Sequence, residues 1–288
     1  MKWRLIEQKE YNAATNMAID HAIYESVANG KENPTIRFYK WDGSSVSIGA
    51  YQNPKEINLD ACKKHSIGIV RRMTGGRAVY HDKADFTYSV IAPIRIFNYS
   101  IENAYKEICS PIINALNELG IKAAIENKND IVVNRKKISG NAAKAMDNGV
   151  YLQHGTLIYD IDFDLMPKIL NVSQDLVKEK VTSILQHKKQ SNASERVNER
   201  ARELNASSRS REHVELSHVT KTRSQLTQKK VYEALKNNFI ANKDFKREEL
   251  SKYELMRADD LARTRYSTIM LPTGTLLKNK GACYVERG

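Results

Sequence analysis

The stretch "RRMTGGRAVYHD", residues 71–82, places three arginines and a Gly-Gly pair between two segments predicted to be strands. The apolar "SIGIV" precedes it and the alternating "FTYSVIA" follows it. Glycine lets a backbone turn tightly or approach a ligand closely, and the planar guanidinium of arginine suits phosphate and carboxylate groups. Clustered arginines repel one another unless an anion lies among them; either Asp82 and Asp85 or a bound phosphate or acyl-phosphate would supply it. The stretch therefore predicts a tight link between strands, and its charges favour an anion-binding loop.

The stretch matches neither of the phosphate-loop patterns G-x-x-x-x-G-K-[ST] and G-x-G-x-x-G, so the folds with those phosphate loops are not implied.

Two further segments carry chemically active residues in strand-like surroundings. In "NRKKISGN", residues 134–141, strand alternation after a hairpin turn places Lys136 and Lys137 on opposite faces. One lysine would be exposed to water and the other would point inward toward an anionic reaction centre. The alternative interpretation is that both are solvent-exposed lysines next to a turn. In "LQHGTL" a single histidine, His154, lies within a strand, where a structural role is common.

The order of predicted elements indicates an α+β fold. Strands dominate the middle of the chain and helices flank them, among them an early helix within 11–30 and an amphipathic helix within 100–120. Pro111 lies inside the second helix and is expected to kink or divide it. At 288 residues the chain is long enough for one large domain, or for one domain with an appendage.

Composition divides the chain into three parts. Residues 1–185 hold the motifs above and are expected to form the core domain. Residues 186–230 contain eleven Lys and Arg against five Asp and Glu and no aromatic residue, so they are predicted to be a polar, basic insertion or linker. Residues 231–288 predict two helices and a short tail, which either complete the core domain or form a reduced accessory region.

The formal net charge of +12 indicates a class of binding partner only once the positions of the charged residues along the chain are considered. About half of the excess lies in residues 186–230, and no basic stripe interleaved with aromatic residues occurs elsewhere, so nucleic-acid binding is not expected. The sequence has no apolar run of about 18 residues and begins without a signal-peptide pattern, so neither a membrane span nor export is expected. Three scattered cysteines, Cys62, Cys109 and Cys283, form no disulfide or metal pattern and favour a reducing cytoplasm.

The three motifs, taken together and in this order, resemble those of the lipoate-protein ligase A family, within the superfamily of biotin/lipoate ligases and octanoyltransferases. "RRMTGGRAVYHD" is similar to the family's R-R-x-[ST]-G-G-G-A-V-[FY]-H-D, and "NDIVVNRKKISGNA" to its N-D-[IL]-V-V-…-K-[IV]-S-G-[SN]-A. "QHGTLIYDIDFDLMPKIL" is similar to its H-H-G-T-L-L-…-D-L-…-L. The resemblance runs from Lys2 to about Thr182 and returns weakly at 257–268. It implies the biotin/lipoate ligase catalytic-domain fold, akin to class II aminoacyl-tRNA synthetases, with a mixed, mostly antiparallel sheet flanked by helices.

The resemblance implies a lipoate-protein ligase as the activity. Such an enzyme converts lipoate and ATP into lipoyl-AMP and passes the lipoyl group to a lysine of a lipoyl domain, in an E2 subunit, or of the glycine cleavage H protein. ATP and Mg²⁺ would be the cofactors, and lipoic acid the substrate. A separate accessory ligase subunit is also implied, because the part after residue 230 is short for the accessory domain of many bacterial ligases.

The resemblance also implies roles for individual residues. Lys137 would be the catalytic residue and, with Arg72, would neutralise charge as the carboxylate attacks the α-phosphorus. Asp130 would orient Lys137 or hold Mg²⁺, and Asn129 would be a supporting group. The implied nucleotide contacts are Arg72, Gly75, Gly76, Arg77, Ala78, Val79, Tyr80 and Lys137. The implied substrate contacts are Arg72, His81, Asp82, Asp130, Ser139, Gly140 and His154.

Arg77 departs from the ligase pattern and is closer to a group of octanoyltransferases, which act without ATP. Those enzymes use a cysteine nucleophile either just before the "NDIVV" segment or, in a second group, after the lysine motif, and this chain has a cysteine at neither place. Cys109 lies within the amphipathic helix and is predicted to be a core residue. The missing thiolate favours activation by ATP, which makes an octanoyl or lipoyl transferase the second interpretation.

Two other interpretations rank lower. A biotin–protein ligase would carry a glycine/arginine-rich loop followed by Trp, which this chain lacks. A non-catalytic nucleic-acid-binding protein is the other interpretation. It does not account for the motifs that contain the clustered Arg and Gly residues, Lys137 and His154. The sequence does not distinguish lipoate from octanoate as substrate, and it does not specify the acceptor or the oligomeric state.

Overall fold

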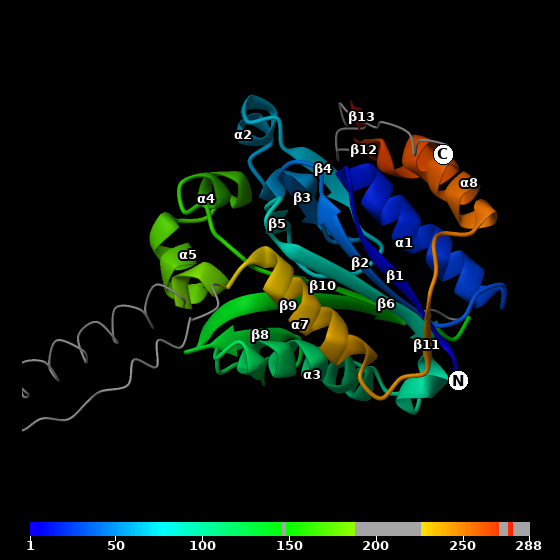
Figure 1. Cartoon of the computed structure of the whole chain (residues 1–288). Coiled ribbons are helices and arrows are strands. Elements are labelled where there is room, and N and C mark those ends of the chain that lie inside the picture. Colours follow the sequence, from blue (N-terminus) through cyan, green and yellow to red (C-terminus); the bar gives the residue numbers. More distant parts are fainter. Residues whose placement is uncertain (146–147, 188–225, 271–275, 279–288) are drawn as a thin grey trace, which may run out of the picture.

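The structure is a computed structural model that describes residues 1–145, 148–187, 226–270 and 276–278. Its centre is an eight-stranded sheet with helices on both faces (Figure 1). In spatial order the strands are β11 (Phe245–Arg247), β1 (Trp3–Tyr11), β2 (Thr35–Trp41), β6 (Phe86–Pro93), β10 (Val150–Leu157), β9 (Lys136–Ala145), β8 (Asp130–Val133) and β7 (Ala124–Glu126). The first three strands of this order are parallel, and every later neighbouring pair is antiparallel. The predicted α+β fold with a mixed, mostly antiparallel sheet is confirmed.

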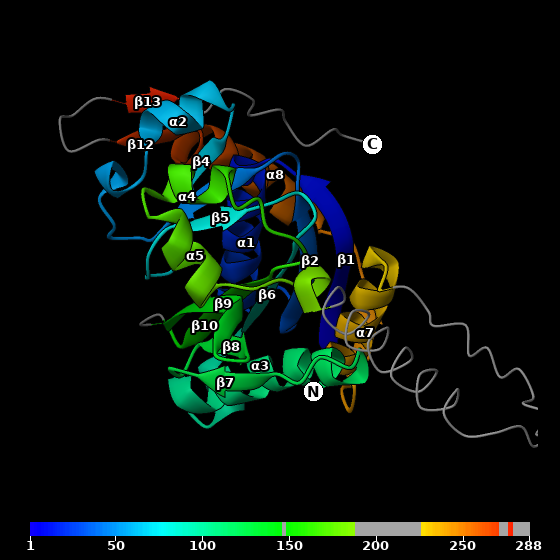
Figure 2. The ribbon, with the colours of Figure 1, turned by 90° about the vertical axis from the view of Figure 1, so that its left-hand side faces the viewer.

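A smaller sheet holds the 71–82 stretch between two of its strands. Its order is β4 (Gly68–Arg71), β3 (Ser45–Ile48) and β5 (Val79–His81), with β3 parallel to β4 and antiparallel to β5. The consecutive strands β2 and β3 therefore belong to different sheets, and the turn between them carries the chain from one to the other. Figure 2 shows three short helices on the side of the small sheet: α2 (Leu59–Lys64), α4 (Leu165–Leu170) and α5 (Gln174–Lys180).

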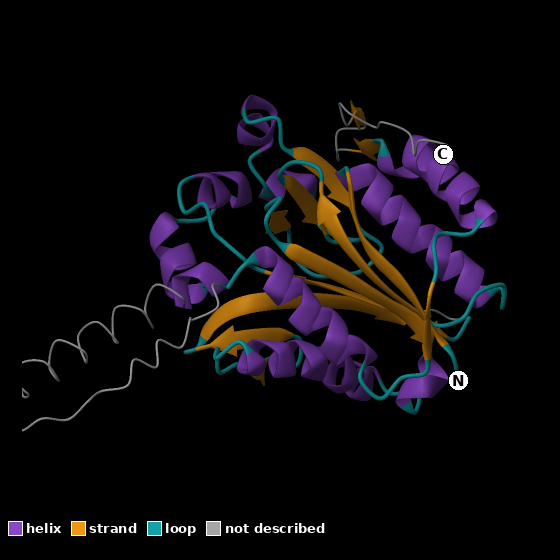
Figure 3. Ribbon diagram, in the orientation of Figure 1, coloured by secondary structure: helices purple, strands orange, loops and turns teal. Residues whose placement is uncertain are grey.

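Helix α1 (Ala13–Ala28) fills the layer between the large sheet and the C-terminal helices. The Asn12 side chain caps it by accepting a hydrogen bond from Thr15 N at 2.9 Å. Most of its residues are buried because the sheet covers one side, while α8 (Lys252–Leu261) and η3 (Ala262–Tyr266) cover another (Figure 3). The early helix predicted from spacing is therefore present, and it is buried on nearly every side.

The opposite face of the sheet is covered by α3 (Ile101–Glu118) and α7 (Gln228–Ile240). Ile108, Ile112 and Leu116 of α3 are buried in the same cluster as the sheet residues Phe38 and Tyr88, as the predicted amphipathic pattern requires. The helix runs through Pro111 without dividing. A proline removes only its own N–H from the ladder, and burial of this face holds the helix together.

The C-terminal segments pack on the same core. Strand β11 extends the large sheet beyond β1, α7 lies against α3, and α8 lies against α1. A last antiparallel pair joins β12 (Thr268–Met270) to β13 (Leu276–Lys278). Most of the polar segment at 186–230 falls outside the described residues, and no helix in the described part is long and apolar enough to cross a membrane.

A buried ion pair joins strand β1, near the N-terminus, to helix α8. The Arg4 guanidinium donates to both Glu254 oxygens, at 2.8 and 2.5 Å, and both side chains are almost fully buried. Glu254 also caps its own helix by accepting from Ser251 N at 2.9 Å. The pair therefore fixes α8 to strand β1.

Replacing Glu254 with alanine is expected to lower the free energy of unfolding by about 3 kcal/mol, because a buried guanidinium would lose its bidentate partner. The value lies at the low end for such pairs because Glu32 Oε2 remains 3.3 Å from Arg4 Nη1. Urea unfolding at neutral pH measures the change. The matched control is Glu249→Ala, which removes the exposed ion pair with Lys9 and should cost less than about 1 kcal/mol. Equal losses in the two variants would contradict the prediction.

Candidate active site

A cavity of about 140 Å³ lies where the small sheet faces β9 and β10 of the large sheet. This volume is roughly ten times the ~10–15 Å³ that one water needs, so the cavity has room for part of a ligand and is larger than an ordinary packing defect. Its walls come from both sheets, from α1 and from the loop between β4 and β5. The lining residues are Met17, Tyr39, Trp41, Ser47, Arg72, Gly76, Arg77, Ala78, Val79, His81, Thr87, Asn129, Lys137, Gly140, Asn141, Ala142, His154, Gly155 and Thr156.

Glycines let the loop after β4 lie directly against the end of β3. A Cβ atom on Gly49 would lie 1.9 Å from the carbonyl oxygen of Gly76, so this approach requires glycine at position 49. Gly76 itself has a φ of +91°, which favours glycine. Ala50 N also donates to Thr74 O at 2.9 Å. The predicted tight link between strands is confirmed, and here the close approach is between two backbone segments.

Arg72 holds this loop from inside. Its guanidinium donates to the carbonyl oxygens of Ser47, Gly75 and Arg77 at 2.8, 2.6 and 2.9 Å, and to Thr74 Oγ1 at 3.1 Å. The side chain is 4% exposed, and burial lowers its pKa to about 10. Among the described residues it forms no ion pair, so its positive charge lies at the cavity wall without a carboxylate beside it.

The acids near this motif do not sit among its arginines. Asp82 accepts from Ser44 Oγ at 3.4 Å, outside the cavity. Asp85 is fully buried and accepts from the backbone N–H groups of Tyr159 and Asp82 at 2.9 and 3.1 Å. Burial raises the pKa of Asp85 to about 8, against the effect of these two donors. The alternative in which Asp82 and Asp85 neutralise the arginines is therefore wrong. Arg71 and Arg72 bind backbone carbonyl groups instead; Arg71, for example, donates to Gln52 O at 2.7 Å.

Lys137 reaches the cavity from the hairpin between β8 and β9. Asn134 and Arg135 both have positive φ angles, of 50° and 63°, as a type I′ hairpin turn requires. Lys137 Nζ lies 2.7 Å from Asp130 Oδ1, whereas Lys136 Nζ points away and donates to Lys178 O at 2.7 Å. The prediction that one lysine points inward and the other outward is confirmed.

Absence of a side chain at position 140 makes room for Lys137. A Cβ atom on Gly140 would lie 2.6 Å from Lys137 Cε and 2.8 Å from Nζ. Nearby, Asn129 and Asn141 exchange hydrogen bonds between side-chain amides and backbone carbonyls, at 2.8 and 2.9 Å. These bonds fix the strand segment that carries Lys137.

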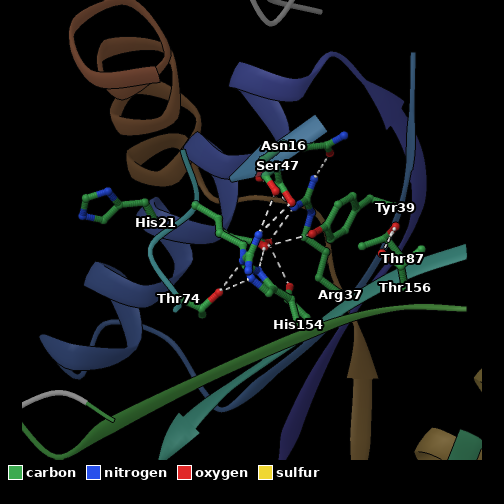
Figure 4. Close-up of polar contacts among 12 residues, drawn as sticks. Asn16, His21, Arg37, Tyr39, Ser47, Thr74, Thr87, His154 and Thr156 are labelled. Carbon is green, nitrogen blue, oxygen red and sulfur yellow. Dashed lines mark hydrogen bonds and ion pairs between the residues drawn. The ribbon is translucent and has the colours of Figure 1, made fainter. Parts of the chain in front are cut away.

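His154 connects the cavity to a buried carboxylate. Its Nε2 lies 2.7 Å from Thr74 Oγ1, and its Nδ1 lies 3.4 Å from Asp20 Oδ2 (Figure 4). Asp20 also accepts from Arg37 Nη1 at 2.6 Å. Burial alone would raise the pKa of Asp20, but Arg37 and His154 outweigh it and lower the pKa, so the carboxylate stays ionised.

His81 faces the cavity between two hydroxyl groups. Its Nε2 lies 2.8 Å from Ser47 Oγ and its Nδ1 lies 3.1 Å from Thr156 Oγ1. The ring stacks on Trp41 with centroids 4.0 Å apart and 15° between the planes. Burial, helped by Arg72 and His154, holds the pKa of His81 well below its usual range, so the imidazole is neutral at neutral pH.

The structure gathers most of the motif residues around this cavity and leaves others behind its wall. Those that line it are Arg72, Gly76, Arg77, Ala78, Val79, His81, Lys137, Gly140 and His154; those that do not are Gly75, Tyr80, Asp82, Asp130 and Ser139. Tyr80 is turned into a hydrophobic cluster because side chains alternate along β5 between Val79 and His81.

Several lining residues escaped the sequence analysis. Ser47 and Trp41 lie on separate strands, and no spacing in the chain links a single serine to a histidine far away in sequence. Asn141 and Thr156 belong to the quoted "SGNA" and "LQHGTL" motifs, which could have indicated them.

The model of the lipoyl protein ligase A/B catalytic domain matches residues 12–238. The chain belongs to this family. Octanoyltransferase LipM from Clostridioides difficile (strain 630) is 35% identical over 201 residues, which cover 62% of this chain and 73% of the relative. A solved lipoate-protein ligase A bound with ATP superposes with a TM-score of 0.72 at 27% identity, covering 95% of this chain and 99% of that one. The bi-partite lipoate protein ligase of Thermoplasma acidophilum, described with its E2 lipoyl domain, gives 0.70 at 27% identity, with 96% and 98% covered.

These comparisons correct the interpretation of the chain as an ATP-dependent lipoate-protein ligase. Curated relatives named octanoyltransferase LipM match at 31–36% identity, above the 27% of the solved ligases. The ligase interpretation is therefore wrong, and octanoyl transfer, the second interpretation, is better supported. The prediction was wrong because it inferred activation by ATP from the absence of a cysteine nucleophile. An amine can attack a thioester directly, so transfer without ATP does not require an acyl group bound to an enzyme cysteine. Arg77 had pointed to the octanoyltransferases, the group to which these relatives belong.

The two described cysteines of this family member lie outside the cavity. Cys62 and Cys109 are buried, and burial raises their pKa to about 11 and about 12. Thiols with such pKa values are poor nucleophiles. Cys109 is a core residue of α3, as predicted, and Cys283 lies outside the described residues.

The implied Mg²⁺ site does not fit the residues present. Within the described ranges no group of three or more His, Cys, Asp or Glu is arranged to hold a metal ion. No carboxylate of the described part of the chain lines the cavity, and Asp130 behind it is already paired with the Lys137 ammonium. Mg²⁺ needs at least one available carboxylate besides substrate phosphates, so Asp130 does not provide such a site.

The buried Asp85 predicts a pH dependence of stability. Its pKa is about 8 in the folded chain against an ordinary value of 3.8, so the folded state binds the proton more tightly. Its stabilising contribution is fully present below about pH 4 and is lost as the pH rises through about 8. Urea unfolding at about pH 5 and pH 8 should show a larger loss at pH 8 in the wild type than in Asp85→Asn. The same pH dependence in both proteins would contradict the assignment.

Proposed function

We propose that this chain transfers an octanoyl group, or a closely related acyl group, from a thioester carrier to a lysine amine of a lipoyl domain, without ATP. The observation that carries the proposal is one cavity that combines three cationic side chains with an apolar wall and has no carboxylate among its described lining residues. The cationic residues are Arg72, Arg77 and Lys137, and the apolar wall contains Met17, Tyr39, Trp41 and Val79. The similarity to octanoyltransferases LipM supports it.

The cationic side chains suit the charge that develops in acyl transfer. When a nucleophile attacks a thioester, the carbonyl oxygen becomes negative, and a fixed cation near it stabilises the transition state. Lys137 Nζ is directed by its ion pair with Asp130, and Arg72 is immobilised by five hydrogen-bond acceptors. Neither has to reorganise when the charge appears.

The remaining wall suits the acyl chain and its carrier. Aromatic and aliphatic side chains beside the cations offer an apolar surface for a hydrocarbon chain. The phosphopantetheine arm of an acyl carrier is anionic, and Arg77 lines the cavity with a planar fork suited to phosphate. The net charge of +12 also favours the approach of acidic carrier and acceptor domains.

The proposal extends to the acceptor, the location in the cell, the division into domains and a partner subunit. The acceptor is a lipoyl domain of an E2 subunit or the glycine cleavage H protein; the description of the Thermoplasma ligase with its E2 lipoyl domain supports the first. A cytoplasmic location follows from the low cysteine count. We propose that residues 1–185 form the catalytic core and that residues 231–288 complete it, with a separate accessory subunit as a further partner.

The test is the intact mass of a purified apo lipoyl domain after incubation with this protein. One tube contains octanoyl–acyl carrier protein and no ATP; another contains lipoate, ATP and Mg²⁺. A gain of one octanoyl group in the first tube is the expected result. A gain in the second tube only would overturn the proposal.

Lys137→Ala is expected to slow this transfer by about 10²–10³-fold, because a preorganised charge at the developing oxyanion would be lost. Lys136→Ala is the matched control: its ammonium lies outside the cavity, and transfer should stay within about twofold of the wild type. Thermal unfolding of both variants checks that the fold is intact. Equal rates in the two variants would contradict the role of Lys137.

Gly140→Ala is expected to lower the transfer rate without large loss of stability. The new Cβ would displace the flexible end of the Lys137 side chain, which can move at little cost to the fold. Gly75→Ala is the control, from the glycine loop and outside the cavity lining, because a Cβ there meets nothing within 4 Å and its φ is not positive. If both variants keep wild-type rates, the position of the Lys137 ammonium does not matter for transfer.

A further inference from the structure

Acyl transfer from a thioester to an amine follows one of two routes. The amine attacks the thioester directly, or an enzyme side chain carries the acyl group in between. The described cysteines are buried away from the cavity, so neither serves as that carrier. The cavity wall does contain a hydroxyl group that faces a neutral histidine, that of Ser47.

We propose that Ser47 is the nucleophile of the transfer and His81 its general base, so that the acyl group is held for part of each cycle as an ester on Ser47 Oγ. This inference rests on the proposed function and concerns the same cavity. The hydroxyl oxygen of Ser47 lies 2.8 Å from His81 Nε2, within the reach needed for proton transfer. Both side chains line the cavity.

The hydrogen-bond pattern directs the Ser47 hydrogen toward His81. Arg72 Nη1 lies 3.3 Å from Ser47 Oγ, and a guanidinium can only donate, so Ser47 is the acceptor of that bond. Ser47 then turns its own hydrogen to His81 Nε2. This places the imidazole proton on Nδ1, where Thr156 Oγ1 lies 3.1 Å away to accept it. Thr156 is thus the orienting third group of the arrangement.

The surroundings hold His81 in position and in the state that accepts a proton. Its ring is stacked on Trp41, whose Nε1 is fixed by donation to Thr87 Oγ1 at 2.8 Å. Thr87 Oγ1 in turn lies 3.3 Å from Thr156 Oγ1, as Figure 4 shows. Burial keeps the imidazole neutral, which leaves Nε2 with a free electron pair.

Arg72 supplies the charge that this chemistry needs. A fixed guanidinium beside a hydroxyl group favours the negative charge that forms on Ser47 Oγ during attack and on the carbonyl oxygen afterwards. Because no carboxylate among the described residues pairs with Arg72, its charge is available to the substrate. The Lys137 ammonium lines the same cavity and adds to this field.

The two half-reactions balance as follows. In the first, Ser47 Oγ attacks the thioester carbonyl carbon, its proton passes to His81 Nε2, the carbon–sulfur bond breaks, and the thiolate leaves with the proton from His81. In the second, the lysine amine of the acceptor attacks the ester carbon and gives a proton to His81 Nε2. The bond between carbon and Ser47 Oγ then breaks, and Ser47 Oγ recovers the proton. No oxidant, reductant or nucleotide is consumed.

The contrasting explanation is that Ser47 only anchors Arg72 and His81. The experiment that separates the two incubates the protein with octanoyl–acyl carrier protein and no acceptor, quenches with acid, and measures intact mass and peptide masses. The expected result is a gain of one octanoyl group on the peptide that contains Ser47. The adduct should resist neutral hydroxylamine, as oxygen esters do and thioesters do not.

Variants identify the residue that carries the acyl group. Ser47→Ala should lose the adduct and slow transfer by at least ~100-fold. Ser47→Cys should regain an adduct that hydroxylamine now removes, which an anchoring role would not produce. Ser45→Ala changes another buried serine of β3 that lies outside the cavity, and it should keep the wild-type adduct. A protein with Cys62, Cys109 and Cys283 all changed to alanine should also keep it.

The possible negative results of the adduct and transfer experiments lead to different conclusions. Octanoyl transfer that continues in Ser47→Ala within about threefold of the wild-type rate, or an adduct that persists in it, overturns the role of Ser47 and leaves the proposed function standing. An adduct on Ser47 without any mass gain of the lipoyl domain supports the nucleophile and overturns the proposed acceptor. Neither adduct nor transfer in the wild type overturns both.

Discussion

The charge of Asp20, buried at the centre of the molecule, is the constraint on which the rest of the structure depends. A carboxylate removed from water is costly unless hydrogen bonds and an opposite charge compensate it. Asp20 obtains these from three strands that pack against its helix: Arg37 at 2.6 Å and Tyr39 at 3.2 Å from β2, Ser89 at 2.9 Å from β6, and His154 at 3.4 Å from β10. Helix α1 and the middle of the large sheet are thereby held in one relative position.

From this charge a connected path of polar contacts leads outward to the cavity. His154 contacts Thr74, Thr74 accepts from Arg72, and Arg72 reaches Ser47, which faces His81. Each of these contacts joins a different part of the chain, so the small sheet and the glycine loop are positioned by the large sheet. Reacting groups held in this way need little rearrangement when charge develops, which is the main means by which proteins accelerate acyl transfer.

The sequence was sufficient for the architecture and for part of the site. Strand periodicity, the "NRKK" turn and the motif around Arg72 and Lys137 are local signals, and the structure places them as the patterns require. The pairing of Ser47 with His81 is not local: it depends on β3 lying beside β5, and no single-sequence pattern encodes that neighbourhood. The alternative that placed Asp85 among the arginines fails for a similar reason. Asp85 instead accepts from Tyr159 N, just beyond the end of β10 and far along the chain.

The buried bond between Arg4 and Glu254 has a consequence for how the protein is made. The two residues are 250 positions apart, and a chain is synthesised from its N-terminus. Strand β1 therefore emerges with a guanidinium whose partner does not yet exist, and its outer edge stays open until β11 is added. The sheet reaches its final width, and strand β1 its final environment, only after β11 and Glu254 have left the ribosome.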